Sequence, residues 1–168
     1  MDVDDLRSLY LSELQEVCDC EAQMAEGLPM LAGSAGSAEL RLVIRQHAGQ
    51  TAQHGQRIEA ILRRHGKSPK PGFDQVAAAL VRKAKQVACG LSDPDLRDAA
   101  LIAAARRVAH HQIAAYSAVE GYAEALYLEI DRRSLLAALQ EEQSTDRQFA
   151  SLQNGANQLA LLVSPLCC

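Results

Sequence analysis

Two glutamates, Glu21 and Glu142, occupy positions where a helical protein normally places apolar side chains. Around Glu21, residues spaced alternately by four and three would share one buried helix face. These positions are Tyr10, Leu14, Val17, Glu21, Met24, Leu28 and Leu31. A buried, ionised carboxylate is costly unless it meets a cation, a metal ion or several hydrogen-bond donors. The chemistry of the chain therefore depends on what other segments bring to Glu21.

Polar side chains also interrupt the apolar face near the middle of each of the remaining three long periodic segments. They are His47, Gln50, Thr51 and His54 in the second segment, His110, His111 and Gln112 in the third, and Glu142 and Asp146 in the fourth. Counted from the Gly33–Gly36 turn, Glu21 and Gln50 lie at similar depth if a helix rises about 1.5 Å per residue. We therefore expect these polar side chains to form one layer across a helical bundle.

Hydrophobic periodicity predicts four long helices and one short helix. The long helices cover residues 4–32, 38–65, 94–128 and 134–160, and the short one covers residues 73–89. Pro29 should kink or loosen the end of the first helix. Short breaks at residues 33–36 and 129–131 give two helical hairpins, and the proline-rich residues 67–72 begin a crossover between them.

The predicted fold is all-α, a ferritin-like four-helix bundle whose long crossover carries a short extra helix. Residues 1–160 should form this single domain. Residues 161–168 are an apolar tail that ends in Cys167 and Cys168.

The composition excludes several classes of protein. A net charge of −4 with no basic cluster gives no electrostatic case for nucleic-acid binding. The first residues lack the basic and apolar regions of a signal peptide, and no apolar run reaches the roughly 18 residues of a membrane helix. We expect a cytoplasmic protein that does not contact membranes.

Five cysteines, with no CxxC motif, favour reduced thiols. Cys18 and Cys20 lie two residues apart on an expected helix and so point in different directions. Four thiolates do not converge in this arrangement, and a structural zinc site of the four-cysteine type is not expected.

Four strings in the chain resemble the YciE/YciF-type ferritin-like family of bacterial stress-associated proteins. They are RDAALIAAARRVAHHQIAAY at residues 97–116, CEAQM around Glu21, HAGQT from His47, and EEQSTD at residues 141–146. The similarity extends from about Leu6 to about Leu152. It implies a ferritin-like bundle that usually dimerises and is suspected of binding two metal ions between its four helices.

The residues that the resemblance carries over are incomplete. Glu21, His47, Thr51, Glu142 and Asp146 match the family pattern. Other positions depart from it: Gly49 and Gln50 stand where the family has consecutive glutamates, Ala52 stands for a histidine, and Ala109 and Gln112 stand for two more glutamates. His54 and His111 are histidines that the family pattern does not include.

This ligand set leaves two interpretations open, because a centre of two iron or manganese ions needs about four carboxylates and two imidazoles. In the favoured one, no metal binds, and amides and histidines donate hydrogen bonds to the buried acids of a structural or interaction protein. In the alternative, the chain is a metal-binding oxidoreductase or metal-storage protein of the ferritin type with a reduced site, in which Glu21, Glu142 and one of His47, His54 or His111 hold a single Fe, Mn or Zn ion. The expected partner is a second copy of the chain, or a relative that retains the metal ligands.

Overall fold

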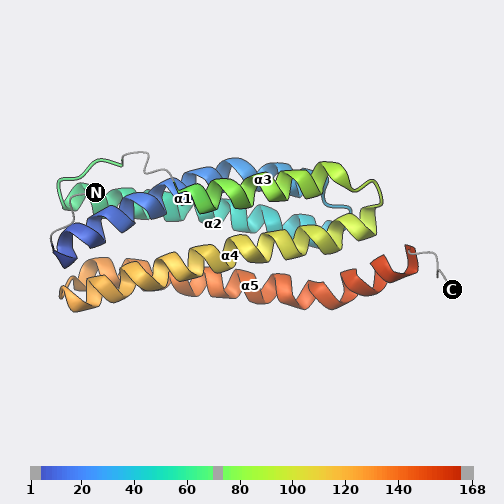
Figure 1. Cartoon of the computed structure of the whole chain (residues 1–168). Coiled ribbons are helices and arrows are strands. Elements are labelled where there is room, and N and C mark those ends of the chain that lie inside the picture. Colours follow the sequence, from blue (N-terminus) through green and yellow to red (C-terminus); the bar gives the residue numbers. More distant parts are fainter. Residues whose placement is uncertain (1–4, 70–73, 164–168) are drawn as a thin grey trace.

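The computed structural model describes residues 5–69 and 74–163, and their regular structure is entirely helical. The helices are α1 (Leu6–Ser34), α2 (Ala38–Arg64), α3 (Gln75–Gly90), α4 (Pro94–Ala125) and α5 (Glu129–Val163). Figure 1 shows the four long helices running alongside one another, with α3 lying along one side of them. The predicted all-α, ferritin-like bundle with an extra crossover helix is confirmed. No helix in these two ranges is both long and apolar enough to cross a membrane.

The helix starts follow the capping signals in the sequence. Ser37 precedes α2 and accepts a hydrogen bond from the backbone N–H of Leu40. Asp93 caps α4 in the same way, and Pro94 takes the first helical position, where its missing N–H has no consequence. Pro29 lies inside α1 without ending it.

The last helix differs from the prediction at both ends. It begins at Glu129 instead of Ser134, because the chain reverses within Leu126–Leu128, where Tyr127 adopts a left-handed backbone conformation with φ of 57°. It also continues to Val163, so the first three residues of the predicted tail are helical. The remainder of that tail, residues 164–168, lies outside the described residues.

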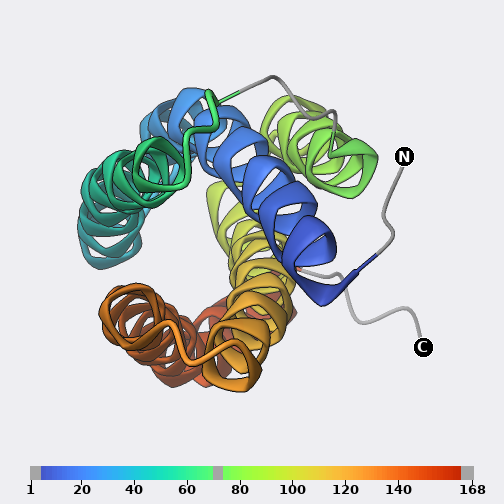
Figure 2. The same ribbon diagram turned by 90° about the vertical axis from the view of Figure 1, so that its left-hand side faces the viewer.

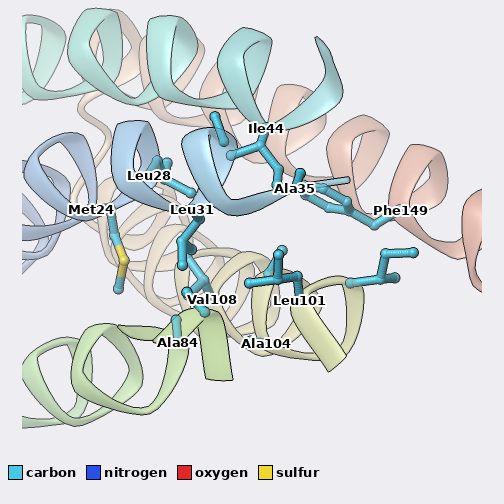
Figure 3. Close-up of a cluster of buried hydrophobic side chains, with 14 of the residues drawn as sticks. Met24, Leu28, Leu31, Ala35, Ile44, Ala84, Leu101, Ala104, Val108 and Phe149 are labelled. Carbon is cyan, nitrogen blue, oxygen red and sulfur yellow. The ribbon is translucent and has the colours of Figure 1, made fainter. Parts of the chain in front are cut away.

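The helices pair as two antiparallel hairpins, α1 with α2 and α4 with α5, and α3 packs against α1 and α4 (Figure 2). The buried apolar side chains form two clusters at opposite ends of the bundle. One cluster lies toward the α1–α2 turn and contains Met24, Leu28, Ile44, Leu101 and Phe149 (Figure 3). The other lies toward the α4–α5 turn and contains Tyr10, Leu14, Ile58, Tyr116 and Leu135. The expected polar layer separates the two clusters.

A buried carboxylate ties the two hairpins together at one end of the bundle. Asp98 of α4 accepts hydrogen bonds from the backbone N–H groups of Gly36, at 2.8 Å, and Ser37, at 2.7 Å. A side chain at position 36 would meet Pro94, because an added Cβ would lie 3.1 Å from its Cβ. Glycine at the turn thus permits the close approach that Asp98 holds.

We predict that Asp98→Ala lowers the free energy of unfolding by roughly 1–3 kcal/mol, because both backbone donors lose a charged acceptor. Asp98→Asn, which keeps one acceptor oxygen, should lose less. Chemical denaturation monitored by circular dichroism measures both changes. Equal stability of Asp98→Ala and the wild type would show that this contact does not hold the hairpins together.

Candidate metal site

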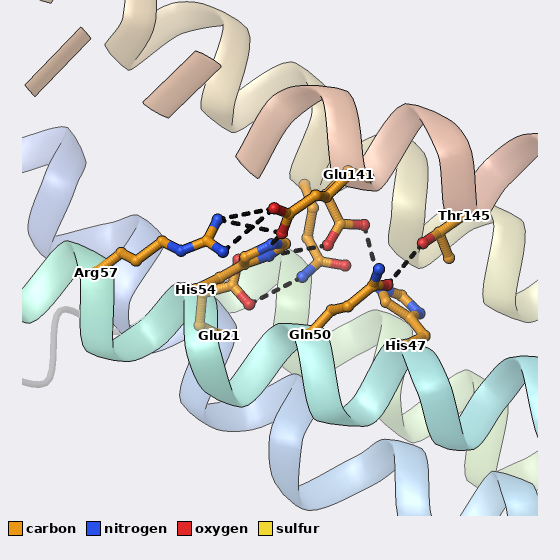
Figure 4. A network of polar contacts seen from close by, with 9 residues as sticks. Glu21, His47, Gln50, His54, Arg57, Glu141 and Thr145 are labelled. Atoms are coloured by element: carbon orange, nitrogen blue, oxygen red, sulfur yellow. Dashed lines mark hydrogen bonds and ion pairs between the residues drawn. The ribbon is translucent and has the colours of Figure 1, made fainter. Parts of the chain in front are cut away.

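The polar layer is built by side chains that the helical spacing aims at the bundle axis. His47, Thr51 and His54 lie one turn apart on α2 and are completely buried. Glu21 on α1 and Glu142 on α5 are also buried, so two acids and two imidazoles meet without access to bulk water. Figure 4 shows Glu21 of α1 and His47 and His54 of α2 pointing into the space between the neighbouring helices.

One oxygen of each acid is held by a neutral or basic donor. Gln112 Nε2 donates to Glu21 Oε2 at 3.1 Å. His47 Nε2 lies 3.1 Å from Glu142 Oε2. His54 stands between the two acids, with Nδ1 3.2 Å from Glu142 Oε1 and 3.9 Å from Glu21 Oε1.

The second ring nitrogen of His54, Nε2, contacts an acid that lies nearer the surface. Its Nε2 lies 2.7 Å from Glu141 Oε2, and Arg57 holds the same carboxylate with contacts of 3.1 to 3.2 Å (Figure 4). This pair of contacts fixes the orientation of the imidazole and directs Nδ1 at the two buried acids. A carboxylate behind a histidine is the usual outer support of a metal-ligating imidazole.

Seven buried side-chain atoms in the described ranges have no hydrogen-bond partner, and all belong to this layer. They are Glu21 Oε1, His47 Nδ1, Thr51 Oγ1, His54 Nδ1, Gln112 Oε1, Tyr116 Oη and Glu142 Oε1. His54 Nδ1 and Glu142 Oε1 are close but are not oriented for a hydrogen bond. Buried polar atoms nearly always have a partner, so seven in one place make this layer a candidate site for ordered water or an ion.

Three of these side chains bring atoms that could bind a metal close together. One ligand atom each from Glu21, His54 and Glu142 can be chosen so that all lie within 4.8 Å of one another. In each residue one polar atom is held by a neighbour while another has no partner. The arrangement offers two oxygens and one nitrogen to a single point.

The charges in the layer are coupled. Burial raises the pKa of Glu21 to about 7, with His54 opposing the rise and the charge of Glu142 adding to it. Burial also acts to raise the pKa of Glu142, but contacts from His47 and His54 outweigh it and lower this pKa below its usual value. Burial acts to lower the pKa of His54, but Glu142, Glu21 and Glu141 outweigh it and raise this pKa. Near neutral pH, Glu142 is therefore the charged acid and Glu21 is close to its midpoint.

Two predicted site residues lie elsewhere. Asp146 faces α4, where Arg106 Nε donates to it at 2.9 Å and His110 lies 3.2 Å away. His111 faces the start of α3 and lies 2.6 Å from Asp74. Neither belongs to the central group, so the expectation that they converge with Glu21 is corrected.

Three residues that stand where the family pattern has glutamates can also be located in the fold. Gln112 lies in the layer, Gln50 at its edge accepts a hydrogen bond from Thr145 at 3.0 Å, and Ala109 is buried without a polar group.

Glu141 and Arg57 belong to the site but were not predicted from the sequence. Glu141 directly precedes Glu142, and Arg57 follows His54 by three residues, which is one helical turn. That spacing was the signal that could have placed an acid and a base beside the buried layer.

Comparison with known proteins agrees with the fold. Protein YciF of Escherichia coli strain K12 is 27% identical over 162 residues, which are 95% of this chain and 98% of YciF. The crystal structure of this E. coli stress protein superposes with a TM-score of 0.88 at 25% identity, covering 93% of this chain and 99% of YciF. YcfI of Rhodopseudomonas palustris superposes with a TM-score of 0.85 at 25% identity, covering 89% and 95% of the two chains.

The chain is thus a ferritin-like helical bundle with a polar layer at mid-length. The family model described as a domain of unknown function, DUF892, matches residues 5–161. The chain belongs to this family, the YciE/YciF-type proteins that the sequence strings indicated.

We predict that Glu21→Gln stabilises the metal-free protein increasingly as the pH rises. The folded pKa of Glu21, about 7, exceeds the usual value of 4.5, so the wild type loses stability between these values as the pH rises. The substituted glutamine cannot ionise and avoids that loss, which is on the order of 2–3 kcal/mol.

Denaturation in the presence of a chelator, at about pH 5 and about pH 8, measures this effect. Glu26→Gln, an exposed change on the same helix, is the matched control. A stability difference between Glu21→Gln and the wild type that does not change with pH would show that Glu21 ionises normally.

Proposed function

We propose that this chain is a structural member of the YciF-type family whose bundle holds one divalent Fe, Mn or Zn ion between Glu21, His54 and Glu142. The observation that carries the proposal is the set of partnerless atoms on these three residues, which face one another in a layer closed to water. Glu21 Oε1, Glu142 Oε1 and His54 Nδ1 each lack an oriented protein partner, and they share one small space.

The residues present do not fit a pair of ions. Bridging two hard cations takes about four carboxylates, and this layer contains Glu21 and Glu142 only. Gln112 supplies an amide in place of an acid, and it already donates to Glu21. A neutral amide oxygen is a weak ligand, so no step that needs two bridged ions is assigned to this chain.

A single ion fits the charges and the orientation of the ligands. Bound there, it would supply the positive charge that Glu21 and Glu142 lack and would join α1, α2 and α5. Glu141 and Arg57 orient His54, while His47 and Gln112 hold the second oxygens of the two acids. These outer contacts keep the ligand atoms in place before an ion arrives.

The proposed role of the ion is structural, since this layer contains two carboxylates and a two-metal centre needs about four. The relatives support this role in part: E. coli YciF is a stress protein, and a structural role has been suggested for YcfI. The homodimer, the pairing with a metal-competent relative and the cytoplasmic location stay predictions.

A metal-free bundle is the second candidate. Its support is that each buried acid already has one donor, Gln112 for Glu21 and His47 for Glu142, and that Glu21 keeps a proton part of the time near neutral pH. In that case the layer would contain ordered water, and the protein would act through its surface alone.

We predict that the chain binds about one Mn²⁺ per molecule, because carboxylate and imidazole ligands suit this ion. Glu142→Gln should abolish binding, and Glu141→Gln, which removes the support behind His54, should weaken it by roughly 10- to 100-fold. Binding should also weaken on acidification, since Glu21 and His54 must both lose protons to act as ligands.

The loss of the electron paramagnetic resonance signal of free Mn²⁺ during titration measures these affinities. Glu59→Gln, on the exposed face of α2, is the matched control and should bind as the wild type does. Two Mn²⁺ ions per chain that are both lost in Glu142→Gln would overturn the single-ion proposal. No binding at all would overturn it in favour of the metal-free bundle.

A further inference from the structure

A second group of metal-binding side chains lies beside the central layer, between α1, α3 and α4. Cys20, Asp74 and His111 each place one ligand atom within 4.8 Å of the other two. His111 Nε2 is 2.6 Å from Asp74 Oδ2. The three residues come from parts of the chain far apart in sequence, so only the tertiary fold brings them together.

The carboxylate of this group is held from several sides. Asp74 Oδ1 caps α3 by accepting from the backbone N–H groups of Val76 and Ala77, both at 2.9 Å. The backbone of Asp74 is itself fixed to α1, where Asp19 accepts from its N–H at 2.9 Å and Gln23 donates to its carbonyl at 3.1 Å. Asp19 and Gln23 flank Cys20, so Asp74 is locked in place next to the thiol.

The three side chains of this group differ in their exposure to solvent. Cys20 is 1% exposed, and Asp74 is also buried. The His111 side chain is 22% exposed and forms the side that faces solvent. Of the three side chains, His111 is therefore the one with the most contact with solvent.

We propose that Cys20, Asp74 and His111 form a second metal site, which takes Zn²⁺ and joins α3 to α1 and α4. A thiolate, an imidazole and a carboxylate are all established zinc ligands, and the sulfur distinguishes this site from the central one. Solvent on the His111 side provides the fourth ligand of a tetrahedral ion.

Binding at this site is a ligand exchange without redox chemistry. The Cys20 thiol and the Nε2–H of His111 each give a proton to solvent, and the imidazole stays neutral with its proton on Nδ1. His111 Nε2 then binds the ion in place of its hydrogen bond with Asp74. The Oδ1 contacts that cap α3 are unaffected, because Asp74 uses its other oxygen for the ion. The site does not share a ligand with the central layer, so either proposal can fail without the other.

The test uses Co²⁺ as a spectroscopic substitute for zinc, because cobalt bound to a thiolate gives a charge-transfer absorption in the near ultraviolet. The full chain is prepared with Cys18→Ala, Cys89→Ser, Cys167→Ser and Cys168→Ser, leaving Cys20 as its single thiol. We expect the charge-transfer band to saturate at about one Co²⁺ bound per Cys20 thiol. Added Zn²⁺ should compete for the site and remove the band.

Matched variants separate this site from its neighbours. Cys20→Ala should abolish the band, and Asp74→Asn, which still caps α3, should weaken cobalt binding at least about 10-fold, as should His111→Ala. His110→Ala, at the neighbouring exposed position, and Glu142→Gln, in the central layer, should keep the band. Absence of the band in the folded single-thiol chain, or its persistence in Cys20→Ala, would overturn the proposal.

A second measurement needs no change of cysteine content. In Glu142→Gln, which lacks the central site, zinc should slow amide hydrogen exchange in α3, because the ion fixes the start of this helix. The same addition to Glu142→Gln combined with His111→Ala should have no effect. Unchanged exchange in the first protein would contradict the second zinc site.

Discussion

The burial of two carboxylates in one closed layer is the constraint on which the rest of this structure depends. Glu21 and Glu142 lie between two apolar clusters, where neither acid can be hydrated by bulk water. Three side chains of the layer contact these acids. His47 and His54 lie next to Glu142, and Gln112 donates to Glu21. These donors do not use every acceptor, and the acids keep oxygens that face one another without a partner. The proposed ion would supply the partner that these oxygens lack.

Helical periodicity predicted the layer because its residues follow the buried face of each helix. Glu21, His47, His54, Gln112 and Glu142 all occupy positions at spacings of three and four within otherwise apolar faces. The helical ends were predicted where capping residues mark them, as at Ser37 and Asp93. The start of α5 was missed because Tyr127 reverses the chain through a left-handed conformation that the sequence does not signal.

The positions of Asp146 and His111 show where periodicity stops being informative. Asp146 follows Glu142 by one helical turn, but Arg106 of α4 attracts its carboxylate away from the axis. His111 precedes Gln112 by one residue and is rotated by about 100°, which turns it toward α3. Cys20 likewise precedes Glu21 by one residue and is rotated by the same angle around α1. The register of α3 could not be predicted, because residues 67–72 carry no periodic pattern, so the meeting of Asp74 with Cys20 and His111 was visible only in the fold.

The central claim is that the bundle axis holds one ion between Glu21, His54 and Glu142. Anomalous diffraction from crystals grown with Mn²⁺ tests it most directly. The claim predicts a single peak in the layer, about 2 Å from one atom of each of these three residues. Two peaks about 3.5–4 Å apart, as in a two-metal centre, or a layer with no anomalous peak, would contradict it.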